Sequence, residues 1–171
     1  MTMTSGGRQT DLRALAAGPW VVVDDGVMGG RSAGAVSEDD GVTMFSGTLS
    51  LENNGGFSSV RLPLSQSLRG FSGLRIKVRG DGRTYQLRLR EGNRFDGVSW
   101  GTSFACSSEW TTLDSPFDRF RPTFRGRAVP QAGPVVAERI GQIGILLGDK
   151  NPGPFRLEVA ALEGIAAAEG K

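Results

Sequence analysis

Strict alternation of apolar and polar residues on both sides of one glycine turn is the feature that most limits how this chain can fold. The turn is Gly80-Asp81-Gly82. Apolar side chains occupy every second position around it, namely Leu74, Ile76, Val78, Tyr85, Leu87 and Leu89. Positions between them carry Arg75, Lys77, Arg79, Gln86, Arg88 and Arg90. A period of two on both sides of a turn predicts an antiparallel strand pair with one buried face.

The rest of the chain continues this β pattern. It has 171 residues, enough for one domain with a sizeable core, and its 26 glycines are dispersed. Further short apolar runs predict strands at residues 20–23, 42–45, 48–51, 57–62, 98–104, 110–113, 139–147 and 155–159. We expect Ser46-Gly47 to close a tight hairpin. About nine to ten strands exceed one flat sheet, so we predict an all-β, antiparallel jelly-roll β-sandwich.

The remaining segments complete the expected domain organisation. We expect residues 1–9 to be a disordered N-terminus, residues 10–165 to form the single jelly-roll domain and residues 166–171 to be a frayed tail. Thr10 is expected to cap a short N-terminal helix over residues 11–17, which Gly18-Pro19 ends. Residues 118–137 contain three prolines and are expected to be irregular.

Six short motifs occur in a fixed order along the chain and carry a family resemblance. They read DDGVMGGRS at 24–32, FSG at 45–47, GGFSSVR at 55–61, RGDGR at 79–83, FRG at 124–126 and GPF at 153–155. Together they resemble the NADH:ubiquinone oxidoreductase complex I intermediate-associated protein 30 family. The resemblance implies a galactose-binding-like jelly roll. It also implies an assembly factor that holds intermediates of respiratory complex I, and it brings no established catalytic residues.

The composition excludes several kinds of active site. The chain contains no histidine and one cysteine, Cys106. A Ser-His-Asp or Cys-His arrangement is therefore excluded, as are an imidazole-based zinc site and an internal disulfide. An enzyme of this composition would have to use carboxylates, arginine, tyrosine or lysine, and a carboxylate-based hydrolase is the enzymatic alternative. We expect no enzyme activity, no cofactor and no metal.

The arginines of the alternating segments are the first candidate binding residues. If the Gly80-Asp81-Gly82 turn closes a simple hairpin, Arg75 lies opposite Arg88, and like charges across a ladder are unfavourable. Acidic neighbours or an anionic partner must offset that repulsion. We therefore expect Arg61, Arg75, Arg88 and Arg90 to line one basic face that receives a partner. Ordinary solvent exposure of these charges is the alternative interpretation.

The glycine-rich turn after residue 23 supplies a candidate rim for this face. Asp24 and Asp25 precede paired glycines, but the alternating ligand spacing of a calcium loop is missing, so a backbone-bonded turn is the favoured interpretation. Met28 either contacts a partner or folds back onto the sandwich edge. Trp100, beside Gly101, is the tryptophan that we expect to be exposed, where it could stack on a sugar ring.

These observations favour a non-catalytic binding module that assists the assembly or stabilisation of a protein complex through its basic face. Respiratory complex I is the complex that the resemblance suggests. A carbohydrate-binding module that uses the same face is the alternative. We expect protein partners, with a glycan as the rival ligand, no nucleic acid and no membrane-spanning segment; the oligomeric state is left open. The polar residues 1–9 favour a cytoplasmic location.

Overall fold

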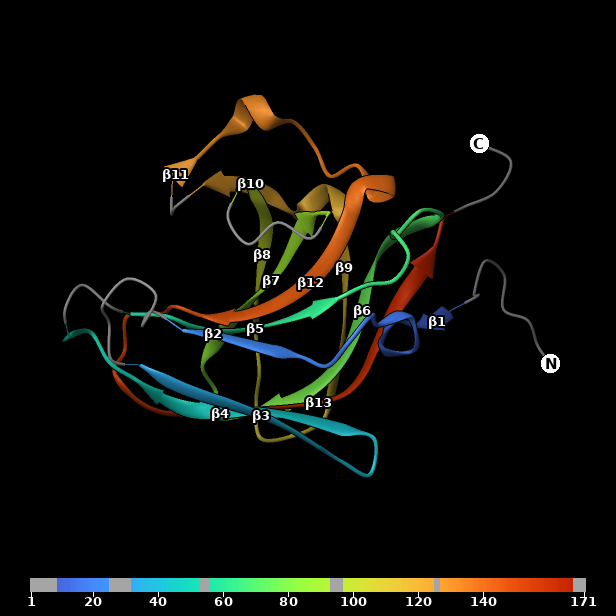
Figure 1. Cartoon of the computed structure of the whole chain (residues 1–171). Helices are drawn as coiled ribbons and strands as arrows, with labels where there is room; N and C mark the ends of the chain where they lie inside the picture. The colour runs from blue at the N-terminus through green and yellow to red at the C-terminus, as the bar shows by residue number, and fades with distance from the viewer. Residues whose placement is uncertain (1–8, 25–31, 53–55, 93–96, 125–126, 168–171) are drawn as a thin grey trace.

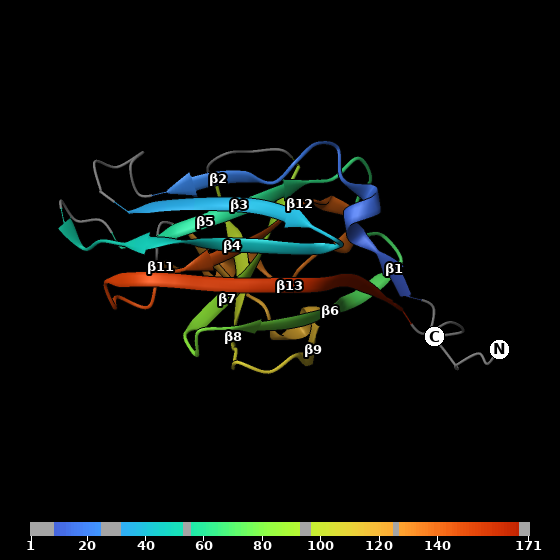
Figure 2. The same ribbon diagram turned by 90° about the horizontal axis from the view of Figure 1, so that it is seen from below.

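A computed structural model of the chain describes residues 9–24, 32–52, 56–92, 97–124 and 127–167. Its strands form two stacked antiparallel sheets, the jelly-roll β-sandwich that the sequence predicts (Figure 1). The first, here called the β13 sheet, contains in spatial order β3 (Ala33–Asp39), β4 (Val42–Leu49), β13 (Gly153–Ala166), β6 (Phe71–Gly80) and β9 (Thr111–Pro116), with β1 (Gln9–Asp11) paired to the end of β13. Figure 2 shows β3, β4, β13 and β6 side by side.

The second sheet, here called the β7 sheet, carries the candidate site. Its spatial order is β11 (Arg127–Ala128), β10 (Arg121–Phe124), β8 (Ser99–Ala105), β7 (Thr84–Glu91), β12 (Ile140–Leu147), β5 (Ser58–Pro63) and β2 (Val21–Asp24). Figure 1 shows the sheet curving, so that β10 and β11 stand above β2 and β5. No helix among the described residues is long and apolar enough to cross a membrane.

The core lies between the two sheets and is built from the alternation in the sequence. Leu74, Ile76 and Val78 of β6 face inward from one sheet, while Leu87 and Leu89 of β7 face inward from the other, and each is at most 1% exposed. Their outward neighbours are partly or fully exposed. Removing these side chains from water is the main stabilising contribution to a fold of this kind.

The predicted β6–β7 hairpin is wrong, because the two strands belong to different sheets. β6 pairs with β13 and β9, whereas β7 pairs with β12 and β8. The Gly80-Asp81-Gly82 turn instead carries the chain from one sheet to the other. Both strands bury one face, and those faces oppose each other across the core. Period-two alternation looks the same in either arrangement.

The Asp81 carboxylate holds this crossing in place. It accepts hydrogen bonds from the Tyr85 hydroxyl at 2.9 Å, from the Arg156 backbone N–H at 2.6 Å and from the Arg83 backbone N–H at 3.0 Å. Tyr85 belongs to β7 and Arg156 to β13, so one side chain ties the two sheets together. Burial and the nearby Asp81 charge raise the pKa of Tyr85, which keeps its hydroxyl protonated as a donor.

Arg83 makes a second bond across the same end of the sandwich. Its Nε and Nη2 atoms donate to the two Asp149 carboxylate oxygens at 2.9 and 2.8 Å, and Nη1 donates to the Pro154 carbonyl at 2.8 Å. The side chains of Arg83 and Asp149 are only 10% and 20% exposed. The hydrogen bonds from Arg83 lower the pKa of Asp149 below its usual range. This bidentate pair fixes the connection between β12 and β13.

A second predicted turn is also wrong. Ser46-Gly47 lies inside β4, which runs unbroken between β3 and β13. The hairpin at this edge is closed by Asp40-Gly41, whose φ values of 54° and 82° suit a two-residue turn. Gly47 is required by packing, because a Cβ there would meet the Ala33 carbonyl oxygen and lie 2.7 Å from the Gly34 Cα.

The N-terminal and proline-rich segments differ in detail from their predictions. The short helix is a 3₁₀ turn, η1 (Leu12–Leu15), and its cap is Asp11 rather than Thr10, since the Asp11 carboxylate accepts from the Arg13 N–H. The segment expected to be irregular contains β10, β11 and the 3₁₀ turn η5 (Pro130–Ala132). Two further 3₁₀ turns, η4 (Phe117–Arg119) and η6 (Ala137–Arg139), overlap its ends. Residues 1–8 and 168–171 lie outside the described residues, and the single-domain boundary stays a prediction.

Asp149→Asn should lower the free energy of unfolding at pH 7 by about 2 kcal/mol, because a charged hydrogen-bond acceptor of Arg83 is lost. Since the pKa of Asp149 is lowered in the folded state, its contribution is complete above the unfolded value near 3.9 and disappears as pH falls through the folded value. Urea denaturation from pH 7 down to about pH 3 should therefore show the difference from wild type shrinking. The exposed Asp114→Asn variant is the control, with an expected effect below about 1 kcal/mol.

Gly47→Ala should destabilise the protein by about 3 kcal/mol or more, because the new methyl group would meet backbone atoms of β3 that cannot move aside. Gly18→Ala is the matched control, since a Cβ there lies 3.9 Å from its nearest neighbour, the Pro63 Cγ. Urea midpoints measure both changes. Equal midpoints for the two variants would contradict the close approach of β3 and β4.

Candidate functional site

The structure brings three of the four predicted arginines together and separates the fourth. Arg61 of β5, Arg88 of β7 and Arg90 of β7 project from the outer face of the β7 sheet and border one shallow hollow. Arg75 lies on β6, on the outer face of the opposite sheet, so its expected pairing with Arg88 is wrong. The cause is the sheet-crossing turn at Asp81, which sends β6 and β7 to different sheets.

Arg75 already has acidic partners on its own sheet. Its Nε and Nη2 atoms donate to the two Asp114 carboxylate oxygens at 2.6 and 2.9 Å, and Glu163 lies opposite it in the ladder. The hydrogen bond with Asp114 raises the pKa of Arg75 and lowers that of Asp114. Acidic neighbours thus balance the charge of Arg75.

A row of alternating arginines and glycines crosses the outer face of the β7 sheet. The ladder pairs Arg61 with Gly144, Gly144 with Arg88, Arg88 with Gly101, and Gly101 with Arg121. The glycines leave room for the arginine side chains. A Cβ at Gly101 would lie 2.9 Å from the Arg88 Cδ and Nε atoms, and a Cβ at Gly144 would lie 3.6 Å from the Arg88 Cβ. Arg88 therefore lies flat against the sheet.

Arg88 is held by neutral groups. Its Nε donates to the Gln86 Oε1 atom at 2.8 Å and its Nη1 donates to the Ser99 hydroxyl at 2.7 Å. Among the described residues no carboxylate bonds to it. Burial, followed by the nearby charge of Arg90, lowers the pKa of Arg88 to about 10, so the guanidinium is still protonated at pH 7.

We call Arg61, Arg88 and Arg90, with the hollow between them, the arginine face. The hollow is also lined by Ser59, Val60, Gln142, Gly144, Ile145 and Leu146. Arg121 stands at the end of the row, where its guanidinium donates to the Asp118 carbonyl at 2.6 Å. Among the described residues, the outward positions of β5, β12, β7 and β8 carry no aromatic ring. The face can therefore bind anions or hydroxyl groups, but it offers no ring for stacking.

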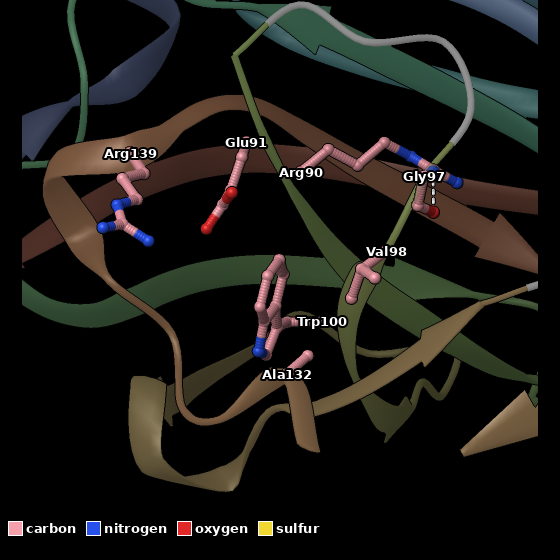
Figure 3. A pocket seen from close by; sticks show the side chains of 7 residues that line it. All are labelled: Arg90, Glu91, Gly97, Val98, Trp100, Ala132 and Arg139. Carbon is pink, nitrogen blue, oxygen red and sulfur yellow. Dashed lines mark hydrogen bonds between the residues drawn. The ribbon is translucent and has the colours of Figure 1, made fainter. Parts of the chain in front are cut away.

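Trp100 is not the exposed tryptophan that we expected. It pairs with Leu89, which faces the core, and it is only 4% exposed. Its indole Nε1 donates to the Gly133 carbonyl at 2.9 Å. Its ring borders a cavity of about 200 Å³ beside the arginine face, which Glu91, Val98, Ala132 and Arg139 also line (Figure 3). No motif in the sequence pointed to Glu91 or Arg139.

The predicted rim is only partly described by the structure. The Asp24 carboxylate accepts a hydrogen bond from the Gly34 backbone N–H at 2.9 Å and another from the Ser58 hydroxyl, so it joins β2, β3 and β5. These bonds agree with the backbone-bonded interpretation of this residue. Asp25 and Met28 lie outside the described residues. Within the described ranges, no three Asp, Glu or Cys side chains are grouped closely enough to hold a metal ion.

Comparison with known proteins identifies the family. Residues 9–159 match the family model of complex I intermediate-associated protein 30. The mitochondrial complex I intermediate-associated protein 30 of Mus musculus is 30% identical over 163 residues, which is 82% of this chain and 50% of the relative. A probable Caenorhabditis elegans counterpart is 32% identical over 146 residues, 72% of this chain and 43% of the relative. The chain thus spans about half the length of the curated relatives it matches.

Solved structures support the fold. A family 11 carbohydrate-binding module from a Clostridium thermocellum cellulase superposes with a TM-score of 0.73 at 16% identity, covering 98% of both chains. A family 29 carbohydrate-binding module superposes with a TM-score of 0.53 at 14% identity, covering 96% of this chain and 97% of the module. Both are similar to this chain in architecture.

The names of the curated relatives correct one expectation and confirm another. These relatives are named as mitochondrial proteins, and this overturns the cytoplasmic location that the polar residues 1–9 favoured. The resemblance carried by the six motifs is confirmed by the family match over most of the chain. The chain belongs to the complex I intermediate-associated protein 30 family.

Proposed function

We propose that the chain is a non-catalytic binding module that assists the assembly of a protein complex by receiving an acidic surface of a partner on its arginine face. The relatives are named for association with intermediates of complex I, which makes a respiratory-complex intermediate the candidate partner. The similarity of the fold to binding modules supports a role in recognition rather than in bond chemistry.

The observation that carries this proposal is that the partly buried Arg88 guanidinium is bonded only to neutral side chains among the described residues. A half-buried guanidinium normally has a carboxylate partner, because burial of an unpaired charge is costly. Arg88 donates hydrogen bonds to Gln86 and Ser99 through Nε and Nη1. The like charge of Arg90 further disfavours the charged form of Arg88. A carboxylate from a partner could bind the Arg88 guanidinium where it lies beside Gly101, Gln86 and Ser99. It would supply the negative charge that the described residues do not give to Arg88.

The same observations favour an acidic protein surface over a glycan. Sugar recognition by sandwich modules relies on an exposed aromatic ring, which stacks on the apolar face of the sugar. Trp100 is buried, and the described outward positions of the central strands carry no ring. Grouped guanidinium groups, by contrast, suit carboxylates.

The double variant Arg61→Gln/Arg88→Gln should reduce capture of complex I subunits by a tagged chain about tenfold or more, because two charged contacts are lost from the interface. The measurement is quantitative mass spectrometry of material purified from the organism's own cells, with reciprocal capture by a tagged complex I subunit. Circular dichroism and melting curves verify that this variant and its control are folded.

Arg75→Gln/Lys77→Gln is the matched control, since it removes two positive charges from the opposite sheet. We expect it to capture subunits as the wild type does. Equal loss in both double variants would mean that net charge, and not the arginine face, controls binding. Undiminished capture by the Arg61/Arg88 variant, or specific binding to a glycan array that the same variant abolishes, would overturn the proposal.

A further inference from the structure

The cavity beside Trp100 is a second candidate site, next to the arginine face, with which it shares Arg90. It lies where β7 ends and β12 begins, and the η5 turn covers one side (Figure 3). Its volume is about 200 Å³, below the range of drug-sized sites, so it suits a small ligand. Trp100, Val98 and Ala132 supply its apolar part. The hydrogen bond from Trp100 to the Gly133 carbonyl fixes the indole against this turn.

Two opposite charges face this cavity without neutralising each other. Glu91 ends β7 and pairs in the ladder with Ile140, so Arg139 lies directly beside that pair. The Gly92 backbone N–H donates to the Arg139 carbonyl at 2.9 Å and holds the two chain segments together. Figure 3 shows the Glu91 carboxylate and the Arg139 guanidinium both directed toward the cavity above Trp100. Within the described residues, neither side chain forms an ion pair.

Arg90 also lines the cavity. In Figure 3 its side chain extends away from Trp100, toward the Gly97 carbonyl to which its Nη1 donates. Among the lining residues, the charged groups available to a ligand are therefore Glu91 and Arg139. Neither belongs to the arginine face, so this site can be altered without changing Arg61 or Arg88.

A carboxylate, a guanidinium and an indole around one small cavity complement a ligand that carries both charges and an apolar group. An ammonium group fits between Glu91 and the electron-rich indole. A ligand carboxylate fits the planar guanidinium of Arg139, which can bind both of its oxygens. From this arrangement we propose that the cavity binds a free amino acid with an apolar side chain, which would contact Val98 and Ala132.

A neutral monosaccharide fits the same groups less well. It would leave the charges of Glu91 and Arg139 without a counter-charge in the cavity. The two ligand classes can be separated directly by experiment, because only the amino acid depends on having both charges.

Isothermal titration calorimetry of the full chain tests the proposal with L-valine, L-leucine and L-methionine. Two truncated probes, 3-methylbutylamine and 4-methylpentanoate, each keep the apolar group of leucine but lack one charge, and glucose is the sugar probe. We expect at least one amino acid to bind, and each truncated probe to bind about tenfold more weakly than leucine or worse. No binding by any of the amino acids, or tighter binding of glucose, would overturn the proposal.

Substitutions at Arg139 and Glu91 then test which charged group of the ligand each side chain contacts. Arg139→Gln should make leucine and 3-methylbutylamine bind equally, because the carboxylate contact is gone, and Glu91→Gln should do the same for leucine and 4-methylpentanoate. Glu138→Gln and Arg119→Gln are matched controls, since both residues are exposed and lie outside the cavity lining, and they should bind as the wild type. If leucine kept its advantage over both truncated probes in the Arg139 and Glu91 variants, the assigned contacts would be wrong.

Discussion

The hydrogen bonds that Asp81 accepts are the constraint on which the rest of the structure depends. The Asp81 carboxylate accepts a hydrogen bond from a hydroxyl of β7 and another from a backbone N–H of β13. These bonds hold the turn at which the chain passes from one sheet to the other. Arg83, two residues later, ties the same end to Asp149 and Pro154. Because of this crossing, the outward side of β7 belongs to the opposite surface from the outward side of β6. The arginine face exists only in this topology.

The alternation in the sequence predicted which side chains are buried, but not which strands pair. Period-two alternation identifies the buried side of each strand, and Ile76, Val78, Leu87 and Leu89 all face the core as expected. Alternation carries no information on the partner strand, so a sheet-crossing turn and a hairpin look alike. Ser46-Gly47 was misread for a related reason, since glycine serves a close approach between strands as well as a turn.

The candidate site was predictable only in part, because its residues come from strands far apart in the sequence. Arg61, Gly144, Arg88 and Gly101 share one row through ladder register, which no local pattern encodes. Trp100 could have been placed in the core from the alternation along β8, because it shares its side of the strand with Phe104, which is also buried. No sequence pattern marked Glu91 and Arg139 as residues of the cavity beside Trp100, because charged residues are common at the ends of strands.

The glycines in the row explain how the fold tolerates grouped arginines. Strands lie about 4.8 Å apart, so Arg61 and Arg88, separated by the strand that carries Gly144, have backbones roughly 10 Å apart. That spacing is close to the screening length of about 8–10 Å at moderate salt, which limits their mutual repulsion. The missing side chain at Gly101 leaves the space that the Arg88 side chain occupies, because a Cβ there would lie 2.9 Å from the Arg88 Cδ and Nε atoms. A larger residue at Gly101 would displace the Arg88 guanidinium, so this glycine matters as much to the proposed binding as the arginines beside it.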